Sequence, residues 1–497
     1  LTLTNYPTLT GHSIIRWQTA DGGYNYNEGI GYTESSAEIN VYAVWAENTY
    51  EITFDKNASA ITGASSSDVK GEMGSQRIAY PATDEETWNG SLVPNRYTVV
   101  GWKFTGWKNT AGGSDVIFED EEDLTGAELL ALASGTPSRY EIQDGVVSSA
   151  VYTVTLQAQW ESIFGDGSGV GTSEGNAFIL NSVNDLYILE ATVFGPEADR
   201  NGKGVYSILD GYYNDNDESG APGYTAEDYE GYYFKLGGDI GNADTPFTGV
   251  IGRVSTDPVG GGSHAGDGAQ NHLDQEDQIT NAVYGDSATS GGNGAAAGTP
   301  FKGTFDGGGY TIYLNINKQK IAEKDAGATI NDDYGTYTNG DETLTGVGLF
   351  GYIDHASIKN LELDGSVHGY SHVGALVGYA FGGTIEEVYN KATVTSGGHD
   401  VGGVIGTFYE LYDSYTRSSV TNAANAGEVK YAPRENGDKS QTLDVEENWD
   451  ELEIIDDAEG VRFGGIVGAG ITLRLTGGYN AGNITARYGV GGVVGTL

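Results

Sequence analysis

Glycine and apolar residues recur in a fixed pattern through the second half of the chain. The hexad Val373–Gly378 reads Val-Gly-Ala-Leu-Val-Gly, and related segments begin at Val347, Val401, Phe463 and Val490. Their first residues are 26, 28, 62 and 27 positions apart. The step of 62 is either two units or one unit with an insertion. A repeat of roughly 27 residues is typical of supersecondary units stacked in a row.

Each unit contains three apolar segments separated by turns. In the unit that starts at Val373 these segments are Val373–Tyr379, Thr384–Tyr389 and Ala392–Thr395. Three short strands with tight corners would complete one turn of a coil, and each strand would pair with its counterpart in the next unit. One coil buries too few aliphatic side chains to offset the entropy lost on ordering its backbone. We therefore expect the coils to be stable only when stacked.

An asparagine marks the same phase in three of the units. Asn390 and Asn480 occupy the same position relative to the starts of their hexads, whereas Asn425 comes seven positions later relative to Val401. That coil therefore has extra residues, which we place near Tyr409–Arg417. We predict that the three asparagines stack as a hydrogen-bonding ladder at one corner; a row of ligand-binding asparagines is the alternative.

The position just before each hexad forms a second column. Its residues are Gly346, His372, Asp400, Arg462 and Gly489. If the coils stack in register, the carboxylate of Asp400 lies between two potential cations. We interpret the column as an exposed ladder of charges, which contributes under about 1 kcal/mol per pair. A catalytic group is the alternative.

The segment before the repeats predicts a cap for the stack. Ala177–Leu180 is typical of a strand, and Asn184–Ala191 of a short helix that would cover the open apolar end of the first coil. Three insertions interrupt the coils, at about 200–230, 253–299 and 430–461. The last carries nine carboxylates between Asp444 and Glu459, together with Trp449. We interpret it as a solvated excursion, with a partner-binding protrusion as the alternative.

From Phe178 onward the order of these elements resembles that of bacterial surface proteins with GLUG motifs. The matching segments are Phe301–Gly307 (Phe-Lys-Gly-Thr-Phe-Asp-Gly), Gly348–Gly351 (Gly-Leu-Phe-Gly) and the repeated hexads. The resemblance extends from Phe178 to the last hexad. It implies that residues 176–497 form a right-handed parallel β-helix, with one coil per repeat unit and an N-terminal capping helix. The predicted fold class is all-β.

Aromatic strand patterns organise the first part of the chain. Trp17 and Trp107 lie in related strand-and-turn segments, and both copies close with Ala-x-Trp, at Trp45 and Trp160. With Ile52–Asp55, these segments resemble the Listeria–Bacteroides repeat, the internalin-type B-repeat family of bacterial surface proteins. The resemblance implies small β-grasp-like modules used as stalks or spacers. Residues 1–48 would be a partial repeat and residues 49–162 an expanded second one, with the four tryptophans in the cores.

Two further features complete the first part. The expanded repeat predicts a short helix at Leu124–Ala133, because Thr125 and Glu128 form a capping box ahead of a leucine cluster. Residues 163–175 are rich in glycine and serine, and we interpret them as the linker between the two architectures.

Composition narrows the range of partners. With 497 residues, the chain is too long for a single core, so two or three domains are expected. Its 70 acidic residues outnumber 25 Lys and Arg, and the net charge of −45 disfavours nucleic acid and anionic membrane surfaces. The chain has no cysteine, which excludes disulfides and thiol chemistry within it. No apolar run approaches the roughly 20 residues of a membrane helix, so no membrane insertion is expected.

One segment suggests a cation site. Asp215, Asp217 and Ser219 occupy positions 1, 3 and 5 of a pattern like a calcium loop, and Gly220 occupies position 6. Position 12 is Ala226 instead of glutamate, so a plain acidic turn is the alternative. The sequence predicts no catalytic residue, no resident cofactor other than this possible Ca²⁺, and no His-Glu-x-x-His element.

These observations indicate the ectodomain of a bacterial cell-surface adhesin. It would lie outside the cell and bind a host or environmental glycan, or a host or bacterial surface protein, without catalytic activity. The alternatives are a carbohydrate-active β-helix enzyme (a polysaccharide lyase or a glycosidase) and a purely structural spacer. No signal peptide or anchor is visible, and the chain opens and stops within a pattern. We therefore expect it to be a fragment of a longer protein.

Overall fold

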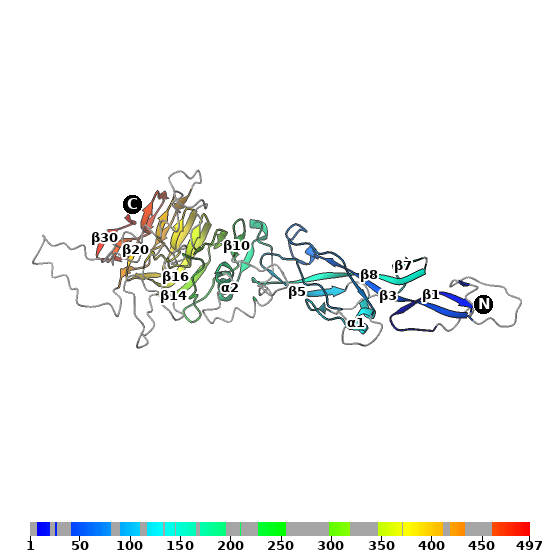
Figure 1. Ribbon diagram of the computed structural model, residues 1–497. Coiled ribbons are helices and arrows are strands. Elements are labelled where there is room, and N and C mark those ends of the chain that lie inside the picture. Colours follow the sequence, from blue (N-terminus) through cyan, green and yellow to red (C-terminus); the bar gives the residue numbers. More distant parts are fainter. Residues whose placement is uncertain are drawn as a thin grey trace, which may run out of the picture. The chain divides into compact units, whose positions relative to one another are not determined.

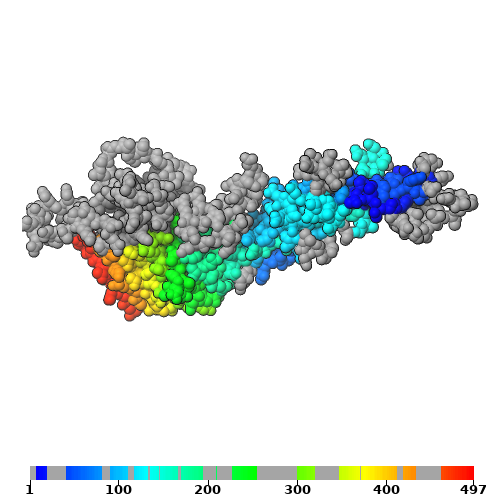
Figure 2. All heavy atoms as spheres, turned by 90° about the horizontal axis from the view of Figure 1, so that it is seen from below, coloured from blue at the N-terminus to red at the C-terminus, as the bar shows by residue number. Residues whose placement is uncertain are grey.

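The chain folds into two compact units built mainly of strands, as a computed structural model shows (Figures 1 and 2). The structure describes residues 7–19, 25–26, 41–80, 90–109, 117–132, 135–144, 146–165, 169–194, 209, 227–254, 298–318, 346–369, 371–410, 418–432 and 460–497. Among them, the first unit ends at Glu161 and the second begins at Ser162. The predominance of strands confirms the all-β class. In these ranges no helix is long and apolar enough to cross a bilayer.

The described residues of the first unit form an eight-stranded sheet and one α-helix. Its elements are β1 (His12–Thr19), β2 (Asn25–Tyr26), β3 (Val41–Asp55), β4 (Gln76–Ala79), β5 (Trp102–Asn109), β6 (Ile117–Phe118), α1 (Gly126–Leu132), β7 (Arg139–Gln143) and β8 (Val146–Ser162). The strand order is β2-β1-β3-β8-β5-β6, with β4 added to β3 and β7 to β8. At its centre β3 and β8 run parallel, from Glu47 opposite Ser149 to Asp55 opposite Gln157.

Local signals predicted the helix of this unit correctly. Glu128 accepts hydrogen bonds from the backbone N–H and hydroxyl of Thr125, and the Glu128 N–H points back to the Thr125 hydroxyl at 3.3 Å. This reciprocal cap confirms the predicted helix start. The boundary predicted between residues 48 and 49 falls inside β3, which is one continuous strand. Trp107 is fully buried beside Phe54, with ring centroids 4.7 Å apart.

The second unit consists mainly of parallel sheets, in which each repeat adds strands beside those of the repeat before it. The largest contains β9 (Phe178–Leu180), β10 (Tyr233–Leu236), β13 (Thr304–Asp306), β14 (Thr311–Asn317), β16 (Ser357–Gly369), β18 (Thr384–Asn390), β19 (Thr393–Ser396), β22 (Ser419–Thr421), β23 (Ala424–Asn425), β24 (Val429–Tyr431), β27 (Leu475–Thr476), β28 (Tyr479–Asn480) and β29 (Ile484–Thr485). Figure 1 shows strands of the second unit side by side from β10 toward the red end of the chain.

Two smaller parallel sheets complete the repeats. One contains β15 (Phe350–Asp354), β17 (Val377–Phe381), β21 (Ile405–Tyr409), β26 (Val467–Ile471) and β31 (Val494–Thr496). The other contains β20 (His399–Gly402), β25 (Val461–Gly464) and β30 (Tyr488–Gly491). Outside the stack, β11 (Arg253–Val254) and β12 (Gly298–Thr299) form an antiparallel pair.

The pairing register confirms the period given by the hexads and resolves the longest step between them. Phe350 pairs with Val377, Val377 with Ile405, Ile405 with Val467 and Val467 with Val494. Because β21 pairs directly with β26, the step of 62 is one unit that carries an insertion. Thr384 pairs with Ser419, 35 positions on. The extra residues of that coil therefore lie between Tyr409 and Ser419, as predicted.

The hexads are corners and not single strands, which corrects the predicted strand Val373–Tyr379. In the repeat of Val401, β20 ends at Gly402, the chain bends at Gly403 and Val404, and β21 starts at Ile405 in a different sheet. Likewise β17 begins only at Val377. The hexads that start at Val401, Phe463 and Val490 therefore each join two sheets, and their second glycine lies at the bend.

Packed aromatic residues and a helix begin the second unit. The predicted linker 163–175 contributes Ile163, Phe164 and Val170 to the buried core, and Phe164 contacts Phe178 with ring centroids 5.1 Å apart. The helix α2 (Val183–Phe194) confirms the predicted short helix. Its Tyr187 packs on Phe247 with ring centroids 5.0 Å apart. The three predicted insertions lie largely outside the described residues.

Candidate functional site

The predicted calcium ligands lie outside the described residues. Asp215, Asp217 and Ser219 all fall in the range 210–226, so the site stays a prediction. Three other groups of polar side chains in the second unit can be built from their contacts. They are the asparagine ladder, the column before the hexads and a corner around Gly382.

The asparagine ladder is confirmed in detail. The side-chain amide of Asn390 donates to Asn425 Oδ1 at 2.8 Å, and that of Asn425 donates to Asn480 Oδ1 at 2.8 Å. Each Oδ1 also accepts the backbone N–H two residues later, and each Nδ2 donates to the carbonyl of that same residue. Asn390 and Asn425 are fully buried. These bonds provide partners for the polar backbone groups of each turn, and they link three successive repeats.

The column before the hexads forms a buried cluster. His372 Nδ1 lies 3.3 Å from Asp400 Oδ2, and Arg462 approaches both carboxylate oxygens, with Nε 2.5 Å from Oδ1 and Nη2 3.0 Å from Oδ2. The stacking prediction is therefore confirmed. The prediction of an exposed ladder is wrong, because only 7% of the His372 side chain and 4% of the Asp400 side chain are exposed.

His399, the residue before Asp400 on β20, also belongs to this cluster. Its Nδ1 lies 3.0 Å from Asp400 Oδ2 and 3.2 Å from Arg462 Nη2. Sequence reasoning missed it, since it lies one residue outside the column. Three of the contributing residues have left-handed backbones, with φ of 52° at His372, 58° at Asp400 and 60° at Arg462. Residues other than glycine are strained in this region, and such strain concentrates at functional sites.

The electrostatics of the cluster hold Asp400 ionised. Burial by itself would raise the pKa of Asp400. The hydrogen bond from His399 and the charges of His399, His372 and Arg462 outweigh burial and lower this pKa to about 2. Among the described residues, His372, His399 and Asp400 bring three possible metal-ligand atoms within 4.8 Å of one another. This arrangement can hold a cation.

A second corner brings together a histidine and two carboxylates. His355 Nδ1 lies 2.5 Å from Asp354 Oδ1, and His355 Nε2 lies 3.8 Å from Glu410 Oε1. Gly382 occupies the position between them in the stack, and a Cβ there would lie 2.9 Å from atoms of His355, Glu410 and Ser418. The missing side chain of Gly382 therefore lets His355 and Glu410 approach each other across one coil.

This corner predicts a pH-dependent contribution to stability. The hydrogen bond to Asp354 raises the pKa of His355 above its usual 6.5, and the charges of Asp354 and Glu410 act in the same direction against burial. A raised folded-state pKa stabilises the fold below about pH 6.5, and the contribution is lost as the pH rises through the folded value. We expect wild type to lose more stability than His355→Gln between pH 5 and pH 8 in urea denaturation. Equal losses would contradict the assignment.

Exposed tyrosines line one face of the largest sheet. The pairing places Glu362, Tyr389, Ala424 and Tyr479 opposite one another on successive strands. Tyr389 is 37% exposed and Tyr479 is 65% exposed. The small side chain of Ala424 separates them, so the two rings lie two strand spacings apart, about 9.5 Å. The sequence reasoning missed this pair, although each tyrosine directly precedes a ladder asparagine.

Lys391 contacts the ring of Tyr389 and also pairs with Glu362. Its Nζ lies 5.2 Å from the centroid of the Tyr389 ring and 2.6 Å from Glu362 Oε2. These contacts restrict the ring and surround it with hydrogen-bonding groups. Glu386 and Glu387 on the same strand are also exposed, so the surroundings of the tyrosine are mainly acidic.

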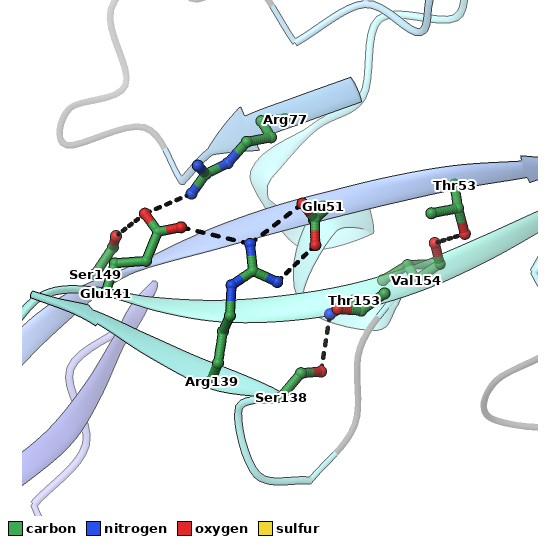
Figure 3. Close-up of polar contacts among 9 residues, drawn as sticks. All are labelled: Glu51, Thr53, Arg77, Ser138, Arg139, Glu141, Ser149, Thr153 and Val154. Carbon is green, nitrogen blue, oxygen red and sulfur yellow. Dashed lines mark hydrogen bonds and ion pairs between the residues drawn. The ribbon is translucent and has the colours of Figure 1, made fainter. Parts of the chain in front are cut away.

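The polar network of the first unit has a structural explanation. Arg139 contacts both carboxylate oxygens of Glu51, at 2.6 and 3.2 Å, and reaches Glu141, which also pairs with Arg77 at 2.7 Å (Figure 3). The hydrogen bonds from the arginines lower the pKa values of both glutamates. The network connects β7 to β3 and β4 at the solvent-exposed surface, where ion pairs contribute little energy.

One comparison with known proteins gives a match. Residues 369–395 match the family described as the GLUG motif. This segment contains the hexad Val373–Gly378 and the ladder residue Asn390, so the resemblance to GLUG motifs is confirmed for this repeat. No curated protein and no solved structure matches the chain.

Proposed function

We propose that the chain is the binding region of an extracellular bacterial adhesin that recognises a neutral, extended glycan without transforming it. The second unit would be a right-handed parallel β-helix closed at its start by α2. The first unit would be the stalk, made of Listeria–Bacteroides-type repeats with β-grasp-like modules. The regular parallel register and the GLUG match at residues 369–395 support this architecture.

The observation that carries the proposal is the pair of exposed rings on one face of the largest sheet. Tyr389 and Tyr479 project from parallel strands in the same register, with Ala424 between them. The apolar faces of sugar rings pack on aromatic rings, and tyrosine adds a hydroxyl for hydrogen bonding. A separation of about two strand spacings is comparable to the distance between alternate sugars of an extended polysaccharide.

The acidic residues around the two tyrosines favour a glycan without negative charge. Glu362, Glu386 and Glu387 lie around the tyrosines, and the whole chain carries a net charge of −45. An anionic polysaccharide would be repelled from this face. The ion pair between Lys391 and Glu362 restrains the Tyr389 ring, which reduces the entropy that binding must remove.

Binding to a glycan array, with and without Ca²⁺, tests this function. Truncating an aromatic anchor at the centre of a binding surface costs about 2 kcal/mol or more. We expect Tyr389→Ala and Tyr479→Ala each to weaken glycan binding by about 30-fold. Tyr42→Ala, at an exposed position of the first unit, should bind like wild type.

Three results would overturn the proposal. Unchanged affinity in both tyrosine variants would exclude this face. Capture of a surface protein without any glycan would assign a protein partner instead. Release of shortened oligosaccharides during incubation would place the chain among carbohydrate-active enzymes.

A further inference from the structure

We propose that His372, His399 and Asp400 form a binding site for a divalent transition-metal ion of the zinc type, and that Arg462 occupies the fourth ligand position until the ion arrives. The residues come from adjacent coils, since Asp400 stacks on His372 and Arg462 stacks on Asp400. A bound ion would cross-link two coils of the repeat.

The distances between the candidate ligand atoms fit a tetrahedral centre. Bonds of about 2.0 Å from zinc to nitrogen or oxygen place neighbouring ligand atoms about 3.3 Å apart. Asp400 Oδ2 lies 3.3 Å from His372 Nδ1 and 3.0 Å from His399 Nδ1. Each of the three residues offers one ligand atom, and these atoms lie within 4.8 Å of one another. Two imidazoles with one carboxylate are ligands suited to zinc and its neighbours in the first transition row.

The guanidinium of Arg462 contacts two of the three candidate ligand atoms, so we assign it to the fourth ligand position of the empty site. Its Nη2 is 3.0 Å from Asp400 Oδ2 and 3.2 Å from His399 Nδ1. It therefore supplies the positive charge that an ion would otherwise bring. The Arg462 side chain is 28% exposed, compared with 4% for Asp400, so it can turn toward solvent while the other three groups stay in place.

The backbone of the column before the hexads is left-handed at each of its positions. His372, Asp400 and Arg462 all have φ between 52° and 60°, in a column that has glycine at Gly346 and Gly489. Glycine takes this conformation without strain, whereas a larger residue is strained there. The middle of the column thus carries strained residues whose side chains converge on one point, and the ends do not.

His372 is also held in place by a neighbour that is not a ligand in this assignment. Thr407 Oγ1 lies 2.7 Å from His372 Nδ1, and the Tyr379 ring meets the imidazole edge-on at 5.5 Å. Metal binding through Nδ1 requires this atom to carry no proton, so the proton would move to Nε2. The hydrogen bond between Thr407 Oγ1 and His372 Nδ1 would be lost when the ion binds.

Titration of the full chain with Zn²⁺, and with Co²⁺ as a spectroscopic probe, tests the site. Excess Ca²⁺ in all samples occupies sites made only of oxygen ligands. We expect one Zn²⁺ per chain and the intense visible absorption of four-coordinate Co²⁺. His399→Gln should weaken binding at least tenfold, and Arg462→Gln should strengthen it several-fold with the same Co²⁺ spectrum. His355→Gln, a histidine outside the cluster, should match wild type.

Each opposite result overturns the proposal. Wild type that binds no Zn²⁺, or binds Co²⁺ with only the weak spectrum of the hydrated ion, excludes the site. Equal affinity in His399→Gln and His355→Gln assigns the binding elsewhere. If Arg462→Gln unfolds without metal, the Zn²⁺-dependent rise in its melting temperature replaces affinity as the readout, and a rise no larger than in wild type contradicts the role of Arg462.

Discussion

Replacing Gly406 with alanine is expected to reduce the free energy of unfolding of the second unit by about 4 kcal/mol or more. A Cβ at this position would lie 2.4 Å from the carbonyl carbon of His372, 2.5 Å from Val373 N and 2.6 Å from Gly378 O. All three are backbone atoms of the preceding coil, so no side-chain rotation can relieve the contact. The strands that flank the hexad would have to separate.

Gly492→Ala is the matched control for this variant. Gly492 belongs to the last hexad, but a Cβ there meets no atom within 4 Å. Six of the seven tryptophans precede residue 161, so tryptophan fluorescence reports mainly the first unit. Urea denaturation followed by far-UV circular dichroism should show the loss for Gly406→Ala alone, with the fluorescence transition unchanged. Equal stability of the two variants would contradict the prediction, because it would mean that successive hexads can move apart without loss of stability.

The same contact explains why the last glycine of the hexad recurs. Cβ atoms at Gly378 and Gly468 would approach backbone atoms of the previous coil at 2.2 and 2.3 Å. Glycine is required at these positions for close packing between coils, and not for an unusual φ. The contact joins residues of two successive repeats. It therefore cannot be predicted from the residues that neighbour the glycine in the sequence.

Repetition made the long-range register predictable from the sequence. The spacing of the hexads predicted the pairing of β17 with β21, and the spacing of Asn390, Asn425 and Asn480 predicted the ladder. In a stack, one sequence interval fixes many contacts at once, because each residue lies on its counterpart in the next coil. The resolution of the longest step needed the direct pairing of Ile405 with Val467.

What the repeats did not reveal are the features that differ from coil to coil. The bend at Gly403 and Val404 was missed because apolar residues on both sides of a corner look like one strand. His399 was missed because it occurs in one coil only, and its role depends on the direction of its side chain toward Asp400. The exposure of Tyr389 likewise depends on which face of the sheet is covered.

One left-handed column of the second unit contains both glycines and residues of the candidate metal site. The column has glycine at Gly346 and Gly489. Glycine adopts the left-handed conformation without strain and contributes no side chain to the cluster. Where His372, Asp400 and Arg462 replace it, the fold accepts a conformational cost and gains a converging set of ionisable groups. The asparagine ladder has no such cost, so we assign it to stability.

Asn425→Ala is expected to destabilise the second unit by about 4 kcal/mol, because several buried polar groups lose their partners at roughly 1–3 kcal/mol each. Asn425 accepts from Asn390 Nδ2 and Gly427 N, and donates to Gly427 O and Asn480 Oδ1, at 2.8 to 3.1 Å. It has no exposed surface, so water cannot replace these bonds without opening the stack. Urea denaturation followed by circular dichroism measures the loss.

Two companion variants separate hydrogen bonding from the filling of space. Asn480→Ala removes the ladder residue that is only half-buried, and it should cost about 1 kcal/mol because solvent can reach the groups it leaves. Asn425→Asp keeps the shape and the acceptor but loses both donors and introduces a charge at a fully buried position. It should be at least as destabilising as Asn425→Ala at neutral pH. A near-neutral Asn425→Asp would show that the ladder fills space and does not hold the coils together by hydrogen bonds.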